Sequence, residues 1–214
     1  MHTIYLLSSV HTEIGNCNSI ELFKIIEAIN PDVIFEELDR ESFEDHYGTN
    51  GPYSTETKAI YEYSKRNNVK HIPIDTYDMS DFSKNDKKYM DETISNYNEK
   101  YRNLIDAQLK VMHLYGFKFL NSQESMDIII ELQNIEDAVQ IQMNDPKLTK
   151  TYKRWKDINI KREHEFIKNV YMYCKENMFN IGLLIAGAEH RSSLIEIINK
   201  HKNNEPKIKW NFCS

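Results

Sequence analysis

The sequence lacks an excess of basic residues, paired cysteines and long apolar runs. Its formal net charge is −6, from 27 Lys and Arg against 33 Asp and Glu, which argues against a general nucleic-acid binder. The three cysteines, Cys17, Cys174 and Cys213, are scattered without paired spacing. They form neither a disulfide framework nor a zinc-finger pattern, and they suit a reducing compartment.

Segments that direct a chain to a membrane are missing as well. No apolar stretch is long enough to span a bilayer, and no basic segment followed by an apolar core and a cleavage site opens the sequence. We therefore expect no membrane span, no signal peptide and a cytoplasmic location. The segment SSVHTEIGN, which spans the end of the first predicted strand and the residues after it, is neither a P-loop nor a Rossmann fingerprint. No serine lies in a G-x-S-x-G elbow.

Five short segments have the apolar pattern of β-strands. The near-continuous apolar run 181–186 is typical of a strand buried on both faces, the usual state in a parallel sheet. The other predicted strands are 3–10, 32–35, 69–74 and 207–213. Pro73 indicates either an edge position or an early end for the third strand, and the alternating pattern of 207–213 favours an edge position for the last strand.

Between these segments the apolar spacing is helical. We expect helices before Pro31, at 55–67, at 158–177 and after Gly187, where Ser193 and Glu196 have capping-box spacing. A strand, a helix and a strand in close succession form a right-handed βαβ unit with parallel strands. Residues 84–145 break this alternation and predict two long helices, with Gly116 and Asn121 between them.

The expected fold is therefore α/β, with a mostly parallel central sheet flanked by helices and a helical insertion in the middle of the chain. The 214 residues suit one domain, whose core comprises 1–83 and 146–214 and whose insertion comprises 84–145. The insertion is either a hairpin over the active-site face or a plain structural cover.

Histidines and acidic residues follow four of the predicted strands where each strand ends. They are His11, Glu36, Glu37, Asp75, Glu189 and His190. Because parallel strands end at one edge of a sheet, these side chains are expected to converge in one cleft. Imidazole and carboxylate are ligands for zinc, manganese or iron, and they are also a general acid/base set without metal. The structural alternative is that strand ends are often polar because strands leave the core there.

The strongest candidates for the shared site follow the predicted strands 32–35 and 181–186, the second of which is called the late strand below. Glu36 and Glu37 point to opposite sides, because side chains alternate along a strand, so at most one faces the shared centre. Gly187 allows a sharp turn after the late strand, and His190 follows it at a helix N-terminus, where backbone N–H groups favour an anion. A buried structural histidine is the alternative.

This layout resembles the TraB/PrgY/GumN and TIKI superfamily, which includes the erythromycin esterases and ChaN-like haem-binding proteins. Its members carry two G-x-x-H motifs, a strand ending in Glu-Leu and an Arg on the helix before the second motif. Here the second motif is intact at 187–190, the Glu-Leu pair is Glu37-Leu38, and the helix Arg would be Arg162. The first motif is degenerate, since Ser8 stands where the family has Gly before Val10-His11. The resemblance covers the first and last thirds of the chain.

The resemblance implies a hydrolytic site. TIKI proteins are described as metal-dependent proteases, erythromycin esterases as hydrolases that use His and Glu, PrgY and TraB as limiting peptide pheromone signalling, and ChaN-like proteins as haem binders. We therefore expect a metal-assisted hydrolase of a peptide, amide or ester bond, with a small peptide or small molecule as substrate. Its ligands or acid/base groups would be His11, Glu37 and His190, with a divalent ion such as manganese, zinc or cobalt.

Arg162 would orient Glu37 or hold a substrate carboxylate or oxyanion, unless it forms a salt bridge on a solvated helix face. Further candidate residues are Glu13, Glu36, Asp75 and Glu189. The alternative from another class is a non-catalytic module that binds a peptide or haem in the same cleft. The degenerate first motif favours that alternative.

Overall fold

A computed structural model of the chain describes residues 1–49, 51–76, 82–201 and 206–213. The described residues form a five-stranded, all-parallel sheet in the order β3-β2-β4-β1-β5. The strands are β1 (His2–Ser9), β2 (Val33–Glu36), β3 (Lys70–Pro73), β4 (Ile181–Gly187) and β5 (Ile208–Phe212). The expected α/β fold is confirmed, and the third and last strands lie at the two edges of the sheet.

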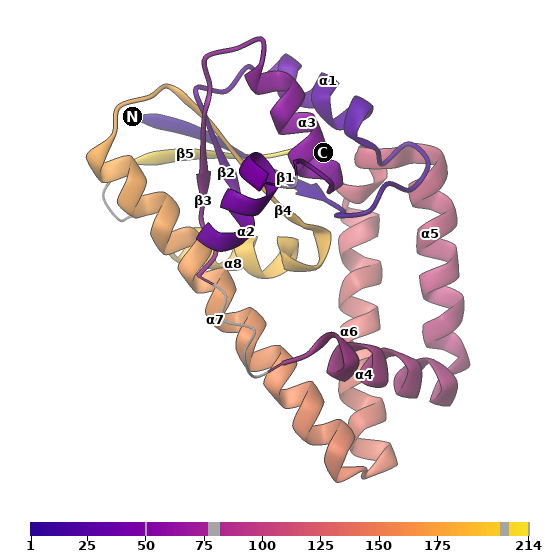
Figure 1. Cartoon of the computed structure of the whole chain (residues 1–214). Helices are drawn as coiled ribbons and strands as arrows, with labels where there is room; N and C mark the ends of the chain where they lie inside the picture. Colours follow the sequence, from indigo (N-terminus) through magenta and orange to yellow (C-terminus); the bar gives the residue numbers. More distant parts are fainter. Residues whose placement is uncertain (50, 77–81, 202–205, 214) are drawn as a thin grey trace.

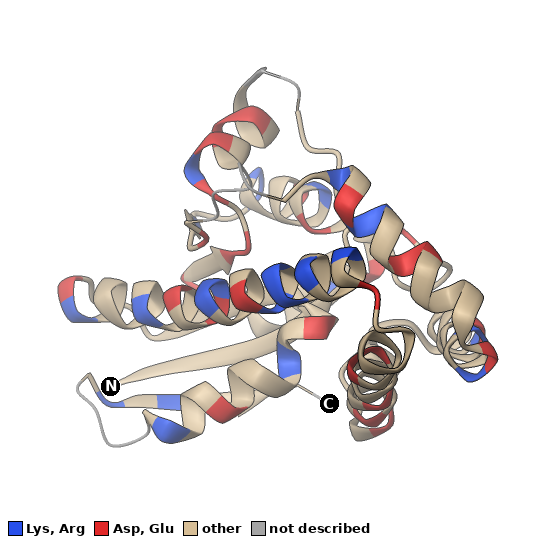
Figure 2. Cartoon of the chain, turned by 90° about the horizontal axis from the view of Figure 1, so that it is seen from below, with Lys and Arg blue, Asp and Glu red and all other residues tan. Residues whose placement is uncertain are grey.

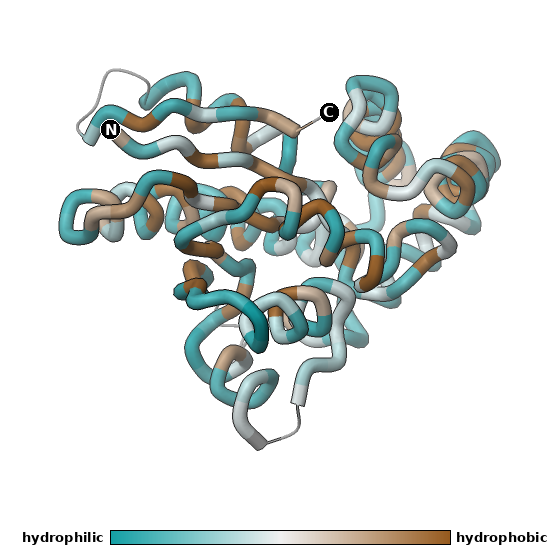
Figure 3. The backbone as a smooth tube through the Cα atoms, turned by 90° about the horizontal axis from the view of Figure 1, so that it is seen from above, coloured by the Kyte–Doolittle hydropathy of each residue, from teal (hydrophilic) through white to brown (hydrophobic). Residues whose placement is uncertain are grey.

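Helices cover both faces of this sheet (Figure 1). One face packs on α1 (Ser19–Ile29) and α3 (Thr55–Ser64), and the other on α7 (Pro146–Glu176) and α8 (Arg191–Lys200). The most hydrophobic stretches of the backbone run through the strands between these layers (Figure 3). β4 is buried over Gly182–Gly187 because both of its faces are covered, which explains its continuous apolar sequence.

The middle of the chain is helical throughout and extends away from the sheet (Figure 1). It contains three helices, α4 (Lys84–Tyr97), α5 (Glu99–Leu120) and α6 (Gln123–Met143), where the apolar spacing had predicted two. The first predicted helix ends at Asn98, whose side chain accepts a hydrogen bond from the backbone N–H of Tyr101 and starts a new helix. Asn121 separates α5 from α6 as expected.

Gly116 interrupts α5 with a non-helical backbone, and two helical segments meet there at a kink, as its predicted place between helices requires. Its φ is 58°, and a Cβ there would lie 2.6 Å from the carbonyl oxygen of Asn16. Asn16 in turn bonds through its backbone N–H to the carbonyl of His113 and through its side chain to that of Leu114. The loop after β1 is thereby fixed to the kink in α5.

The helix predicted at 158–177 begins twelve residues earlier, at Pro146. Asp145 caps its first turn, and Pro146 occupies a position where its missing N–H is not needed. The added length packs on the helical segment in one apolar cluster that spans α4 to α7. Its buried members are Met90, Ile94, Tyr101, Ile135, Val139, Leu148 and Tyr152. The hydrophobic packing of the segment 84–145 therefore continues into the first turns of α7.

Three shorter elements complete the described chain: α2 (Arg40–Glu44), the π-helical turn η1 (Asp45–Thr49) and the 3-10 turn η2 (Ala188–His190). Basic and acidic residues are interspersed along the helices (Figure 2). A search of the described residues finds no helix with the length and apolar character needed to cross a membrane.

Candidate functional site

The ends of β1, β2 and β4 lie side by side at one edge of the sheet. β1 and β4 pair in register, with Ser9 beside Gly187, and β2 pairs with the other side of β4. The chain then turns into η2 after β4, and it enters an irregular loop at Val10 and His11 after β1. The residues after these strands are therefore neighbours in space, as expected for parallel strands.

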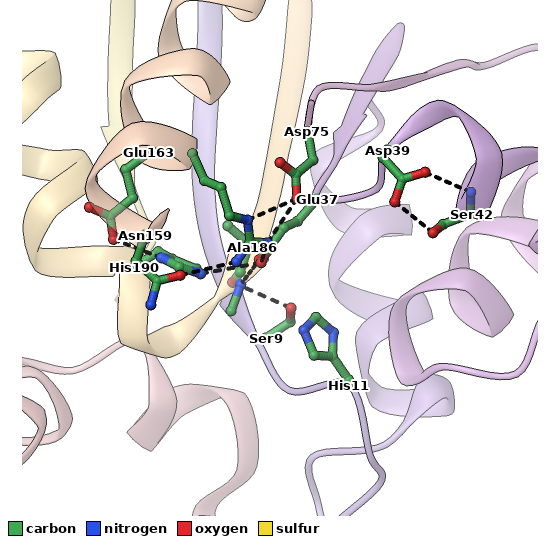
Figure 4. Close-up of polar contacts among 12 residues, drawn as sticks. Ser9, His11, Glu37, Asp39, Ser42, Asp75, Asn159, Glu163, Ala186 and His190 are labelled. Carbon is green, nitrogen blue, oxygen red and sulfur yellow. Dashed lines mark hydrogen bonds and ion pairs between the residues drawn. The ribbon is translucent and has the colours of Figure 1, made fainter. Parts of the chain in front are cut away.

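Glu37 is the centre of this cluster. Its Oε1 lies 3.2 Å from His190 Nε2 and accepts a hydrogen bond of 2.7 Å from Arg162 Nη2. Its Oε2 accepts a hydrogen bond of 2.6 Å from the backbone N–H of Gly187. Arg162 also donates from Nε and Nη2 to one oxygen of Asp75, at 3.0 and 2.8 Å. Arg162 thus contacts two acidic residues at once, and the side chains of Glu37, Asp75 and His190 lie together at this sheet edge (Figure 4).

His190 is held by carboxylates at both ring nitrogens. Its Nδ1 lies 2.7 Å from Oε1 of Glu163, while Nε2 faces Glu37. The other oxygen of Glu163 accepts a hydrogen bond of 2.5 Å from Ser193 Oγ. Ser193 therefore orients Glu163 and does not form the predicted capping box; α8 begins at Arg191 without a side-chain cap. Only 5% of His190 is exposed, so both contacts are shielded from solvent.

The charges in this cluster determine each other's ionisation. Burial opposes the charged form of His190, but the charges of Glu37 and Glu163 outweigh it and raise the pKa of His190 to about 10. Burial likewise opposes ionisation of Glu37, but His190 and Arg162 outweigh it and keep the pKa of Glu37 well below its ordinary range. At Asp75 burial dominates and raises the pKa despite the Arg162 contact. His190 and Glu37 thus form a buried imidazolium–carboxylate pair at neutral pH.

His11 lies on the neighbouring strand end in a different environment. Its side chain is 64% exposed, and Nδ1 lies 3.1 Å from Oε1 of Glu56. The same oxygen accepts a hydrogen bond of 2.7 Å from Ser9 Oγ. The hydrogen bond to Glu56 raises the pKa of His11 to about 9, with further contributions from the charges of Glu56, Glu37 and Glu189. His11 and Glu37 are close enough to influence each other's pKa although they share no hydrogen bond.

Both histidines line one cleft of about 570 Å³. One wall consists of the strand ends with Ser9, His11 and His190, and the other of helices α4 to α7 with Tyr101 and Trp155. The volume lies within the range of roughly 300–1,000 Å³ that is usual for small-ligand sites. The helical segment therefore supplies a wall of this cleft.

No family model, curated protein or solved structure matches this chain. The family resemblance therefore rests on its short motifs and on their order along the chain. Of the residues in those motifs, His11 and 187–190 line the large cleft, whereas Glu37 and Arg162 contact each other and are not among its lining residues.

The structure does not bring a closed set of metal ligands together. Among the residues that it describes, no three or more His, Cys, Asp or Glu side chains are arranged to hold a metal ion. His11 turns its Nδ1 to Glu56, and Nε2 of His190 faces Glu37. The three expected ligands lie at one sheet edge. In this arrangement Glu56 lies against Nδ1 of His11 and Glu37 lies against Nε2 of His190, where an ion would otherwise bind.

The further candidates have separate roles. Glu189 is exposed and lines the cleft, and Asp75 holds Arg162. Glu36 points to the other side of β2, where its oxygens bond to His71 Nδ1 at 2.9 Å and Tyr47 Oη at 2.6 Å. Only one residue of the Glu36-Glu37 pair faces the cluster, as the alternation along a strand predicted. Glu13 lies outside the cleft lining and bonds to Ser19, at 3.1 Å to N and 2.6 Å to Oγ.

Sequence reasoning missed two residues, Glu56 and Glu163, that hold the two rings. Glu163 precedes Phe166 by three positions and Val170 by seven, so it continues the buried stripe of α7. A carboxylate on an apolar stripe was the available signal. Glu56 lies in the first turn of α3, and nothing in its local sequence distinguishes it from a surface residue.

Gly187 also differs from its expected role. Its φ is −55°, which any residue can adopt, and a Cβ there would lie 3.4 Å from Glu37 Oε2, an ordinary contact. Its contribution is the backbone N–H that binds Glu37. The position does not require glycine for a left-handed turn.

A buried asparagine joins the helical segment to both strand ends. Asn121 Oδ1 accepts from the backbone N–H of Ser8 at 2.7 Å and from Arg191 Nη1 at 3.1 Å, and Nδ2 donates to the carbonyls of Ser8 and Phe117. Ser8 Oγ accepts a further hydrogen bond from Arg191 at 3.3 Å. Ser8 is thus part of the network that docks the α5–α6 corner beside the cleft.

Proposed function

We propose that the cleft binds a small peptide or another amide or ester and hydrolyses it. The observation that carries this proposal is the pair of histidines on one cleft wall, each with Nδ1 held by a carboxylate. A carboxylate at one ring nitrogen fixes the orientation and the proton position of an imidazole, which is how catalytic and metal-binding histidines are prepared.

In the metal-assisted form of the proposal, His11, Glu37 and His190 would hold a divalent ion such as manganese, zinc or cobalt. The kind of donor fits, because two imidazoles backed by Glu56 and Glu163 match the usual outer-shell pattern of metal-binding histidines. A bound ion would supply a Lewis acid and a water molecule with a pKa near 7. Binding would require His190 to exchange its proton and its contact with Glu37 for the ion.

The protein's own residues would position this chemistry. Arg162 and the backbone N–H of Gly187 hold the two oxygens of Glu37 and keep it ionised. Glu163 fixes the His190 ring at Nδ1, so that Nε2 stays directed at Glu37. The wall formed by α4 to α7 limits water around the bound substrate.

A second candidate function is a binding module for a peptide or haem without turnover. The observation in its favour is that both ring nitrogens of His190 face carboxylates, so the buried network is already satisfied without an ion or a substrate. Tight ligand binding without product would support this candidate over hydrolysis.

The test combines metal analysis of the purified protein with a screen of peptide, amide and ester substrates, run with and without chelator. We expect hydrolysis that is lost in His190→Ala and retained in His164→Ala, an exposed histidine on α7. Activity that chelator abolishes and manganese, zinc or cobalt restores supports the metal-assisted form, while chelator-resistant activity supports acid/base catalysis. Haem or peptide binding with no product from any substrate contradicts the hydrolase.

A further inference from the structure

A second, much smaller cavity lies behind His11. It has a volume of about 20 Å³ and lies where β1, β2 and α3 meet. Ser9 and His11 line both this cavity and the large cleft, so they form the boundary between the two. A volume of about 20 Å³ exceeds the roughly 10–15 Å³ that one water molecule needs and is far too small for a substrate.

The wall of the small cavity contains an unsatisfied buried oxygen. Glu56 is 9% exposed, and its Oε1 accepts hydrogen bonds from Ser9 and His11. Its Oε2 is buried and has no hydrogen-bond partner among the described residues. Leaving a buried acceptor without a partner costs about 1–3 kcal/mol, and more for a charged group, so a water molecule is strongly favoured beside it.

The rest of the cavity surface is mostly apolar. Glu36 and Glu37 border it from β2 and its end, and Ser54 and Thr57 from the start of α3. Glu36 and Glu37 already hydrogen-bond to protein groups, so Glu56 Oε2 is the anchor for the water. The apolar part of the lining is Leu38, Ile60 and Ile185.

We propose that this cavity holds one ordered water molecule anchored by Glu56, and that this water passes Ser9 and His11 into the cleft as the reactant in hydrolysis. The role as reactant rests on the proposed function, whereas the water site itself does not. In the reaction the water oxygen bonds to the carbonyl carbon, the bond to the leaving nitrogen or oxygen breaks, and a water proton ends on that leaving atom. Glu56 is then a positioning residue for water.

The water site is tested by a high-resolution crystal structure of the free protein. We expect density for one water within hydrogen-bond distance of Glu56 Oε2. It should persist in Glu56→Gln, which keeps an acceptor or donor at that position, and disappear in Glu56→Met, which keeps the bulk without polarity. An empty cavity beside other well-ordered buried waters, or a protein partner on Oε2, would overturn the site.

The role as reactant is tested with the best substrate from the screen in the presence of hydroxylamine, a nucleophile too large for the cavity. In Ile60→Phe, which enlarges an apolar lining residue of the cavity and leaves Glu56 and His11 unchanged, we expect kcat for hydrolysis to fall about tenfold or more with little change in KM, while formation of the hydroxamate persists. The hydroxamate fraction therefore rises. Glu62→Gln, on the exposed side of the same helix, is the matched control and should behave as the wild type.

The two outcomes separate this inference from the proposed function. If hydrolysis and hydroxamate formation fall together in Ile60→Phe, or if neither falls, the reacting water does not come from the cavity. If the protein hydrolyses nothing, the reactant role falls with the proposed function, and the crystal structure alone decides the water site. Ile185→Phe, on the strand side of the same cavity, gives the same kinetic readouts if Ile60→Phe does not fold.

Discussion

The two histidine-bearing strand ends differ although they are neighbours. His190 follows β4 through a 3-10 turn that returns the ring to the interior, where two carboxylates hold it. His11 follows β1 in an irregular loop, where its ring is largely exposed and one carboxylate holds it. The same residue type on adjacent strands thus acquires different burial and a different number of partners from the backbone that follows each strand. We expect the buried end to determine stability and the exposed end to act mainly in function.

The largest effect is expected from His190→Ala. The change leaves Glu37 and Glu163 without their shared cation in a buried site, and breaking a buried charge pair costs roughly 3–5 kcal/mol. Urea unfolding followed by circular dichroism measures this loss. The control is Lys168→Ala, at an exposed position of α7, the helix that carries Glu163. Its free energy of unfolding should stay within about 0.5 kcal/mol of the wild-type value. An unchanged unfolding midpoint in His190→Ala would show that the two carboxylates do not depend on His190.

The pH dependence of stability is the next effect. The folded pKa of His190 is about 10, above the ordinary value of about 6.5, so folding favours its proton. The stability that His190 contributes is therefore complete below about pH 6.5 and is lost as the pH rises through about 10. Unfolding free energies at several pH values should fall more steeply over this window in the wild type than in His190→Gln, by a few kcal/mol. Parallel curves for the two proteins would contradict the buried imidazolium.

A smaller effect on stability is expected from His11→Ala. The ring is 64% exposed and water screens its contact with Glu56, so its loss should change the unfolding free energy by no more than about 1 kcal/mol. Hydrolysis should nevertheless fall by about a hundredfold, because an acid/base group or a metal ligand is removed. Equal losses of stability in His11→Ala and His190→Ala would remove the distinction between the two strand ends.

The smallest effect concerns the degenerate motif. Ser8→Gly introduces the glycine of the motif that this segment resembles, but it removes the oxygen that accepts from Arg191 and adds backbone freedom to a strand. We expect it to destabilise the protein by about 1 kcal/mol. Ser8→Ala separates the two contributions, because it removes the hydrogen bond without the glycine. A gain of stability in Ser8→Gly would indicate that the serine is a defect and not a part of the Asn121 network.

The sequence predicted the strands and the strand ends well for a physical reason. A strand buried on both faces needs a continuous apolar run, and polar residues at its end must leave the core at a known edge, so His190 and Glu37 could be placed together. Arg162 was placed through the family motif. Each of these inferences depends on one segment and on one rule of sheet geometry.

The partners on helices could not be predicted in the same way. Glu56 and Glu163 reach the histidines only because α3 and α7 dock at a given rotation and height on the sheet, and local spacing does not contain that information. The same limit explains the division of the helical segment into α4 and α5 at Asn98, where one side-chain cap outweighs a continuous apolar spacing. The early start of α7 did have a local signal, because Asp145 before Pro146 is a helix-start pattern. The predicted start at residue 158 was based on the spacing of apolar residues alone.

The pairing of β1 has a consequence for synthesis on the ribosome. In the described sheet β1 lies between β4 and β5, and Leu7 lies beside Ile185, about 180 residues later in the chain. At a translation rate of roughly 5–20 residues per second, β1 waits on the order of 10–35 s for its first partner. During that time its apolar side chains lack their neighbours in the sheet, while α4 to α6, which have local contacts, are free to form. Nascent chains should therefore be most prone to aggregate and most dependent on chaperones until β4 emerges.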